Sequence, residues 1–191
     1  MCDGARFAPE GRGELFAAEY DSPIGRLTLA AGGEGLVGLW LEDQKYFGSG
    51  LAEKLRAGRG GELDAAAAWL DRYFAGERPL ISELRLAPRG SDFRRTVWAL
   101  LCAIPYGETV TYGELAARTA AKLGRERMSA QAVGGAVGHN PISVIIPCHR
   151  VVGADGSLTG YAGGTDRKLR LLQHEGADAG RLFIPKRGTA L

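Results

Sequence analysis

The hydrophobic pattern of this chain changes its period near residue 90, and that change limits the folds open to it. Before this point, short apolar runs between glycine and proline predict a strand, a turn and a strand over residues 20–31. A third strand is predicted over residues 35–41, which completes a small antiparallel meander. Residues 65–74 follow as an alanine-rich amphipathic helix, and the remainder to about Pro88 reads as a linker.

After residue 90 the pattern is helical. An apolar stripe from Phe93 to Ile104 predicts a helix that stops at Pro105. Thr111 and Glu114 form a capping-box pattern for a helix that should run to about residue 121.

Ser129 can cap a second short helix through Val137, so the local arrangement is helix, turn, helix. Residues 165–176 predict a capped basic helix that ends at a glycine. We therefore expect an α+β protein with two domains. An N-terminal α/β domain and linker would occupy residues 1–88, and a mainly helical domain residues 89–191.

The two parts differ in charge. Residues 1–84 carry 9 Lys/Arg and 14 Asp/Glu, a net −5, whereas residues 85–191 carry 15 and 8, a net +7. This asymmetry favours a polyanionic partner for the C-terminal part, although a solvated basic face is the simpler alternative. No stretch approaches the roughly 20 apolar residues of a transmembrane helix, and the first residues lack a signal-peptide core. We expect a cytoplasmic protein with no membrane partner.

Residues 130–138 are almost all small, and three of them are glycine. A glycine costs up to about 1 kcal/mol in a helix interior relative to alanine, so this composition needs a reason. Either another surface approaches the helix backbone closely, or the helix packs tightly within the core.

One thiol stands out. The cysteines are too far apart for a disulfide framework or a paired zinc site; they are Cys2, Cys102 and Cys148. The most apolar run, residues 142–146, reads as a buried strand-like segment, and the tetrapeptide Pro147-Cys148-His149-Arg150 follows it directly. Cysteine reacts as its thiolate, with a reference pKa of about 8.5, so a neighbouring base or cation decides its reactivity. The alternative is a buried core cysteine beside a hydrogen-bonded histidine.

The stretch from Phe93 to Gly176 resembles the O6-alkylguanine-DNA alkyltransferases, above all in Asn-Pro-Ile-Ser-Val-Ile-Ile-Pro-Cys-His-Arg-Val-Val-Gly at residues 140–153. Supporting matches follow in order at residues 106–108, 111–116, 132–136, 160–164 and 171–176. Residues 22–25 and 35–40 also resemble the first domain of that family. The resemblance implies a ribonuclease H-like N-terminal domain and a C-terminal domain with a helix-turn-helix of winged-helix type.

The resemblance further implies DNA repair by a single irreversible transfer of an alkyl group, without cofactor or metal, from O6-alkylguanine in double-stranded DNA. The acceptor would be Cys148, with His149 activating it through a water and Glu175 orienting the imidazole. Asn140 would fix the turn that carries the cysteine, and Tyr112 would hydrogen-bond the guanine. Activity on O4-alkylthymine stays open, and a monomer is sufficient.

In this family the second helix of the motif enters the minor groove and the damaged base is flipped out of the duplex. Ala132, Gly134 and Gly135 would let the DNA backbone approach. Residues 157–164 would form the wall of the alkyl pocket. The residues expected at the pocket are Pro147, Tyr161, Ala162 and Gly163.

Three departures from the family pattern are visible. Gln131 stands where many members place an arginine that fills the gap left by the flipped base, and we interpret it as the wedge. In the preceding turn, Arg125 or Arg127 would supply the phosphate contact. Ala162 replaces a hydroxyl residue of some relatives, which leaves a backbone N–H for the guanine oxygen. The early cysteine and histidine ligands of zinc-binding relatives are missing.

Two other functions remain. A cysteine hydrolase could use Cys148 and His149, but no oxyanion-hole motif is recognisable and adjacent side chains rarely converge on one substrate. A binding module, either a regulator or a non-repairing relative, is the second alternative. A cysteine at the acceptor position argues against a non-repairing relative.

Overall fold

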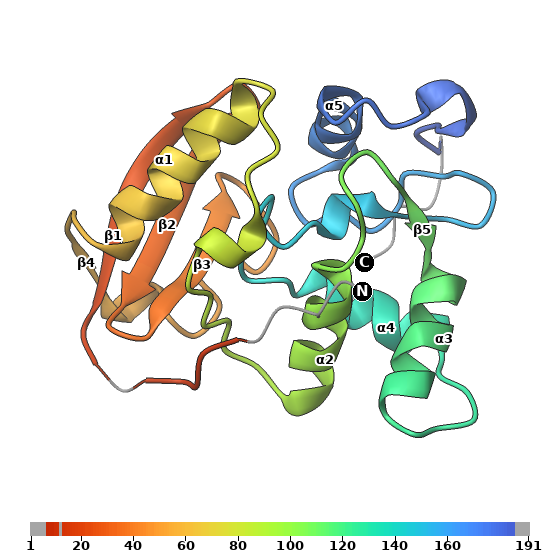
Figure 1. The fold of residues 1–191 in the computed structure, drawn as a ribbon, viewed down its shortest axis with the longest axis horizontal. Coiled ribbons are helices and arrows are strands. Elements are labelled where there is room, and N and C mark those ends of the chain that lie inside the picture. Colours follow the sequence, from red (N-terminus) through yellow and green to blue (C-terminus); the bar gives the residue numbers. More distant parts are fainter. Residues whose placement is uncertain (1–6, 12, 186–191) are drawn as a thin grey trace.

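The structure is a computed structural model, and it describes residues 7–11 and 13–185. Its N-terminal part is a four-stranded sheet (Figure 1), in the order β3-β2-β1-β4. The predicted meander is confirmed as β1 (Leu15–Ser22), β2 (Gly25–Gly32) and β3 (Gly35–Leu41), paired antiparallel. The strand β1 begins five residues before the predicted start at residue 20. The sequence pattern did not predict β4 (Leu55–Ala57), a three-residue strand that pairs parallel with β1.

A single long helix, α1 (Glu62–Phe74), lies across this sheet. It begins three residues before the predicted start. Its apolar stripe is buried, and the members of that stripe are Leu63, Ala66, Trp69, Leu70 and Tyr73. Gly76, at φ 88°, ends the helix in the left-handed region that favours glycine.

The C-terminal part is mainly helical, as predicted. Its helices are α2 (Asp92–Leu101), α3 (Tyr112–Lys122), α4 (Ala130–Gly138) and α5 (Thr165–His174). Two short strands, β5 (Val110–Thr111) and β6 (Val151–Val152), pair parallel. The remaining elements are short 3₁₀ helices at Ala52–Lys54, Ile81–Glu83, Cys148–Arg150 and Ala179–Arg181.

Side-chain caps set the helix-turn-helix. Thr111 and Glu114 form the predicted capping box at the start of α3, and the Ser129 hydroxyl accepts a hydrogen bond from the backbone N–H of Ala132 in α4. The helix α4 packs against both α2 and α3. On the α2 side, the Trp98 indole N–H donates to the Ala136 carbonyl at 2.8 Å.

One predicted helix end and one predicted cap in the C-terminal part were wrong. The helix α2 ends at Leu101, and the apolar stripe continues to Ile104 through a turn in which the Ile104 N–H donates to the Leu101 carbonyl. The helix α5 starts without a side-chain cap, because its N-cap is Gly164 at φ 93°. Its end before Gly176 is confirmed.

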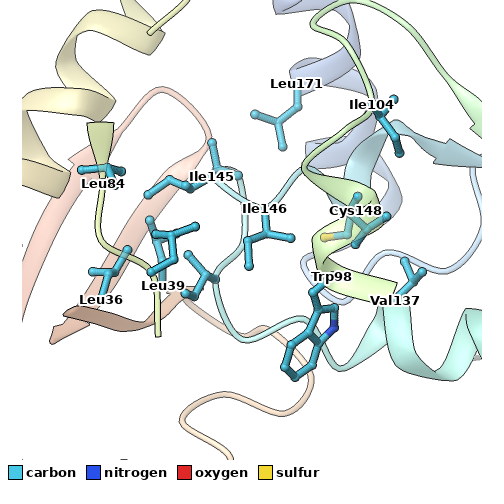
Figure 2. Close-up of a cluster of buried hydrophobic side chains, with 14 of the residues drawn as sticks. Leu36, Leu39, Leu84, Trp98, Ile104, Val137, Ile145, Ile146, Cys148 and Leu171 are labelled. Carbon is cyan, nitrogen blue, oxygen red and sulfur yellow. The ribbon is translucent and has the colours of Figure 1, made fainter. Parts of the chain in front are cut away.

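The two parts share one continuous core, in which buried side chains of the sheet meet those of the helices (Figure 2). Backbone hydrogen bonds cross the same boundary. Leu39 of β3 donates to the Pro141 carbonyl and accepts from Ser143 N–H, both at 2.8 Å. The Ser143 hydroxyl donates to Gln44 Oε1 at 3.0 Å. The sheet edge is therefore joined to the segment that leads to Cys148.

Among the described helices, none has the length and apolar character required to cross a membrane.

Candidate active site

The apolar run before Cys148 is a turn, so the prediction of a strand-like segment was wrong. Asn140 causes the turn: its Oδ1 accepts from the Ile142 N–H at 3.1 Å, and its Nδ2 donates to the Ile146 carbonyl at 2.8 Å. Val144 lies at φ 67°, a conformation that is costly for a β-branched residue. Only Ile142 keeps a bridge to β3. The side-chain amide thus replaces the hydrogen bonds that a strand would have made.

Cys148 is the first residue of a 3₁₀ helix and is 5% exposed. Figure 2 shows it in the apolar cluster that includes Ile146 and Trp98. Asn140 Nδ2 donates to its Sγ at 3.1 Å. Burial raises the pKa of the Cys148 thiol, and the Asn140 hydrogen bond only partly opposes that effect. At neutral pH the thiol is therefore protonated, and it needs a base to react.

His149 is the titratable side chain that directly follows this thiol in the sequence. It is fully buried, and its Nε2 lies 2.8 Å from Glu175 Oε1. Burial lowers the pKa of His149, with partial opposition from Glu175, so the imidazole is neutral at pH 7. An ionised carboxylate can only accept, so the Nε2 carries the proton and Nδ1 carries the lone pair. Among the described residues, Nδ1 has no hydrogen-bond partner.

Glu175 is the centre of a buried hydrogen-bond network. Its carboxylate accepts from Tyr73 Oη, Gly107 N, His149 Nε2, and Arg150 Nε and Nη2. Burial alone would raise the pKa of Glu175, but His149 and Arg150 outweigh it and hold that pKa well below its usual range. Arg150 also donates to the Ile104 carbonyl at 2.6 Å. Arg150 thus faces the carboxylate, which suits a bracing role.

Sequence reasoning missed two polar residues of this site. Lys168 is fully buried, and its Nζ donates to the carbonyls of Val151 and Thr159. Burial lowers the pKa of Lys168 to about 8. Its position three and four residues before Leu171 and Leu172 places it on the apolar face of α5, and that spacing could have revealed it. The other residue is Tyr73, whose contact with Glu175 spans 102 positions and has no local signal.

Several residues expected at the pocket lie in or beside the loop at residues 159–164. The Tyr112 hydroxyl donates to the Thr159 carbonyl at 3.0 Å. Tyr161 is buried, and its hydroxyl has no hydrogen-bond partner in the described structure. The Ala162 carbonyl accepts from the Lys45 N–H, which ties this loop to the N-terminal part. A cavity of about 340 Å³ lies beside it, lined by Lys45, Tyr46, Gly138, Gly160, Tyr161, Ala162, Gly164 and Thr165.

Two more of the expected pocket residues, Pro147 and Gly163, are also buried. Pro147 directly precedes the thiol, whereas a Cβ at Gly163 would lie 2.4 Å from the Leu41 side chain. A side chain at position 163 would therefore have to displace the Leu41 side chain of β3.

Four of the residues expected at DNA are exposed, whereas Gly134 is buried and Gly135 is partly buried. Gln131 and Ala132 are exposed on α4, and Arg125 and Arg127 are exposed in the turn before it. The two glycines of α4 differ. A Cβ at Gly134 would make ordinary contact with the Tyr112 ring, at 3.7 Å, whereas nothing lies within 4 Å of a Cβ at Gly135. Packing inside the protein gives no reason for the second glycine.

Comparison with known proteins identifies matches over both parts of the chain. Residues 15–88 match the family profile described as 6-O-methylguanine DNA methyltransferase, ribonuclease-like domain. Residues 92–177 match the profile described as 6-O-methylguanine DNA methyltransferase, DNA binding domain. The methylated-DNA–protein-cysteine methyltransferase of Mycolicibacterium paratuberculosis is 49% identical over 157 residues, covering 81% of this chain and 88% of that protein. The Haemophilus influenzae protein of the same name is 40% identical, covering 84% and 86%.

Solved structures agree with these matches. A crystal structure of Mycobacterium tuberculosis O6-methylguanine methyltransferase has a TM-score of 0.71 and 43% identity, covering 91% of this chain and 96% of that one. The structure of M. tuberculosis OGT in complex with DNA has a TM-score of 0.73 and 42% identity, covering 87% and 94%.

Replacing Arg150 by Met tests the buried network. Glu175 would be left as a poorly compensated buried charge, so we expect the free energy of unfolding at pH 7 to fall by about 3–5 kcal/mol. The matched control is Arg72→Met, which removes the more exposed ion pair with Glu83 and should cost below about 1 kcal/mol. Urea denaturation followed by circular dichroism measures both. Equal losses in the two variants would contradict the assignment.

The difference in stability between wild type and Arg150→Met should also depend on pH. The folded-state pKa of Glu175 is depressed, so its stabilising contribution is present above the unfolded pKa of about 4.3 and is lost as pH falls toward the folded value. The stability difference between wild type and Arg150→Met should therefore shrink below about pH 4. A difference that stays constant from pH 7 to pH 3 would show that Glu175 is not the partner concerned.

Proposed function

The chain belongs to the 6-O-methylguanine DNA methyltransferase family, and from this membership we propose that Cys148 is the residue that accepts the alkyl group. The protein repairs DNA by transferring the methyl group of O6-methylguanine to one of its own cysteines. The observation that carries the assignment to Cys148 is its position between the Asn140 turn and the His149–Glu175 pair.

The reaction is a direct displacement at the alkyl carbon. The thiol proton of Cys148 passes through a water to His149 Nδ1, and the sulfur forms a bond to the carbon as the bond from that carbon to guanine O6 breaks. A thiolate is soft and strongly nucleophilic, so it attacks an alkyl carbon more readily than a hydroxyl would. Glu175 keeps the imidazole in the tautomer that accepts this proton.

The leaving guanine needs a hydrogen bond so that it does not depart as a bare anion. Tyr112 is the proposed donor, exchanging its bond to the Thr159 carbonyl for one to the base. Because Ala162 has no hydroxyl, its backbone N–H would serve the guanine oxygen. The buried side chains of Pro147 and Tyr161, with Gly163, would surround the alkyl group. The thioether has no ready reversal, so each molecule acts once and needs no cofactor.

The target base lies inside the duplex and must be extruded, at a cost of a few kcal/mol. We propose that α4 enters the minor groove, with Gln131 as the wedge and with Ala132, Gly134 and Gly135 next to the DNA backbone. The C-terminal part, which carries a net +7 from Arg85 onward, would supply the phosphate contacts, Arg125 and Arg127 among them. We set the domain boundary between residues 88 and 89.

A monomer suffices, since one chain provides every group of the reaction. We propose the cytoplasm as its compartment, because an acceptor thiol must stay reduced.

Intact mass spectrometry tests the acceptor. After incubation with duplex DNA containing O6-methylguanine, the wild-type chain should gain one methyl group per molecule, and Cys148→Ala should gain none. The matched control is Cys102→Ala, because burial raises the pKa of Cys102 to about 12 and makes that thiol a poor nucleophile. Cys102→Ala should be methylated like wild type. An unchanged wild-type mass would refute alkyl transfer and favour a binding module.

Two substitutions separate extrusion from chemistry. Gln131→Ala should slow transfer from duplex DNA by roughly 10-fold or more, because the flipped state loses its wedge. Transfer from a free O6-substituted guanine should not change. Arg127→Ala should weaken duplex binding and reduce its salt dependence. Rates that fall equally on both substrates would show that neither residue serves extrusion.

Gly135→Ala tests the role of the glycine whose Cβ position is unobstructed. No described atom obstructs the added methyl group, so the substitution should raise the free energy of unfolding, by up to about 1 kcal/mol. It should at the same time weaken binding to duplex DNA, measured by fluorescence anisotropy. A variant that is more stable and binds DNA normally would contradict the proposal that DNA approaches the helix backbone closely at this position.

A further inference from the structure

Tyr73 connects the N-terminal part directly to the proposed catalytic pair. It lies in the last turn of α1, is 1% exposed, and donates its hydroxyl hydrogen to Glu175 Oε1 at 2.7 Å. The same oxygen accepts from His149 Nε2 at 2.8 Å. A side chain from the first domain therefore shares one carboxylate oxygen with the proposed base.

We propose that Tyr73 is a positioning residue of the transfer reaction, which sets the orientation and hydrogen-bonding strength of Glu175 toward His149. This inference rests on the proposed roles of His149 and Glu175. It gives the N-terminal domain a part in the chemistry beyond that of a brace.

The geometry of the carboxylate explains why one hydroxyl matters. Arg150 bonds both oxygens, through Nε to Oε2 and Nη2 to Oε1, and Gly107 N–H bonds Oε2 at 3.3 Å. The only donors to Oε1 besides Arg150, among the described residues, are His149 and Tyr73. Tyr73 thus holds Oε1 in place and withdraws part of the charge that this oxygen offers to the imidazole.

The ring of Tyr73 is held independently of its hydroxyl. It stacks on Trp69 at 5.4 Å between ring centroids and meets the edges of Phe74 and Tyr106. Its backbone carbonyl lies 2.7 Å from His174 Nε2. Removing the hydroxyl alone should leave this aromatic cluster intact, because Phe preserves the ring.

Several other groups face the His149–Glu175 pair and have to be kept constant in a test based on pH. They are Cys148, Arg150, Tyr161 and Lys168 in the C-terminal part, and Tyr106 and His174 around the end of α1. Substituting Tyr73 by Phe changes none of the others.

The experiment compares full-length wild type, Tyr73→Phe and Tyr20→Phe. Tyr20 is a matched control, because its hydroxyl also donates to a carboxylate at 2.8 Å, but to Asp71 Oδ1 of α1 rather than to Glu175. The rate of transfer to Cys148 is measured from pH 5 to pH 9, with duplex DNA and with a free O6-substituted guanine.

In Tyr73→Phe we expect the plateau rate to fall by about 3- to 10-fold on both substrates, because the imidazole is less well oriented. The acid limb of the pH–rate profile, where protonation of His149 lowers the rate, should move to higher pH by roughly 0.3 unit or more. The reason is that a carboxylate with one donor fewer stabilises the protonated imidazole better. Tyr20→Phe should match wild type in both respects.

Fluorotyrosine placed at position 73 alone gives a second variant that keeps the hydroxyl and the packing. It is a stronger donor, so the acid limb should move to lower pH. This measurement decides the matter if Tyr73→Phe proves too unstable to assay.

An acid limb that stays in place in both variants would overturn the proposal, even if the rate falls, because a purely structural role would lower the rate without moving the limb. A wild-type chain that gains no methyl group would instead refute the proposed function itself. A wild type that is methylated, beside variants indistinguishable from it, would refute only the role of Tyr73.

Discussion

The buried carboxylate of Glu175 is the interaction on which the arrangement of this protein depends. Removing a charge from water costs several kcal/mol unless donors surround it, so the fold must bring donors to this point. They come from α1, from the turn at Gly107 and from the 3₁₀ helix that begins at Cys148. One charge at the end of α5 therefore fixes the relative positions of segments that are far apart in the sequence.

Burial and the donors around Glu175 together set the protonation of the three groups at the site. Burial raises the pKa of Cys148 and lowers that of His149, while the donors around Glu175 keep the carboxylate ionised. The resting state is thus a neutral thiol near a neutral imidazole. A protein that is consumed by one transfer benefits from this state, because a thiol that stays protonated is a weak target for other alkylating or oxidising agents.

The sequence predicted what local hydrogen bonds determine. Thr111 and Ser129 cap helices because their partners are three residues away, and the meander follows from period-two patterning. The turn before Cys148 was not predicted, because apolar residues such as Val144 favour a strand until the amide of Asn140, bonded to Ile142 and Ile146, overrides them.

Long-range partners explain why the site itself was only partly predicted. His149 and Glu175 were paired through the resemblance to a family, since no spacing rule joins positions 26 apart. In the sequence, Tyr73 is one more aromatic residue on the apolar stripe of α1. Only the folded structure shows that its hydroxyl donates a hydrogen bond to the Glu175 carboxylate. The N-terminal domain, which carries no chemical motif, thus contacts this region at Glu175 through Tyr73, at the Pro141–Ser143 segment through Leu39, and at Ala162 through Lys45. Each contact positions a different segment near Cys148. The packing of the two domains against each other therefore determines the geometry around Cys148.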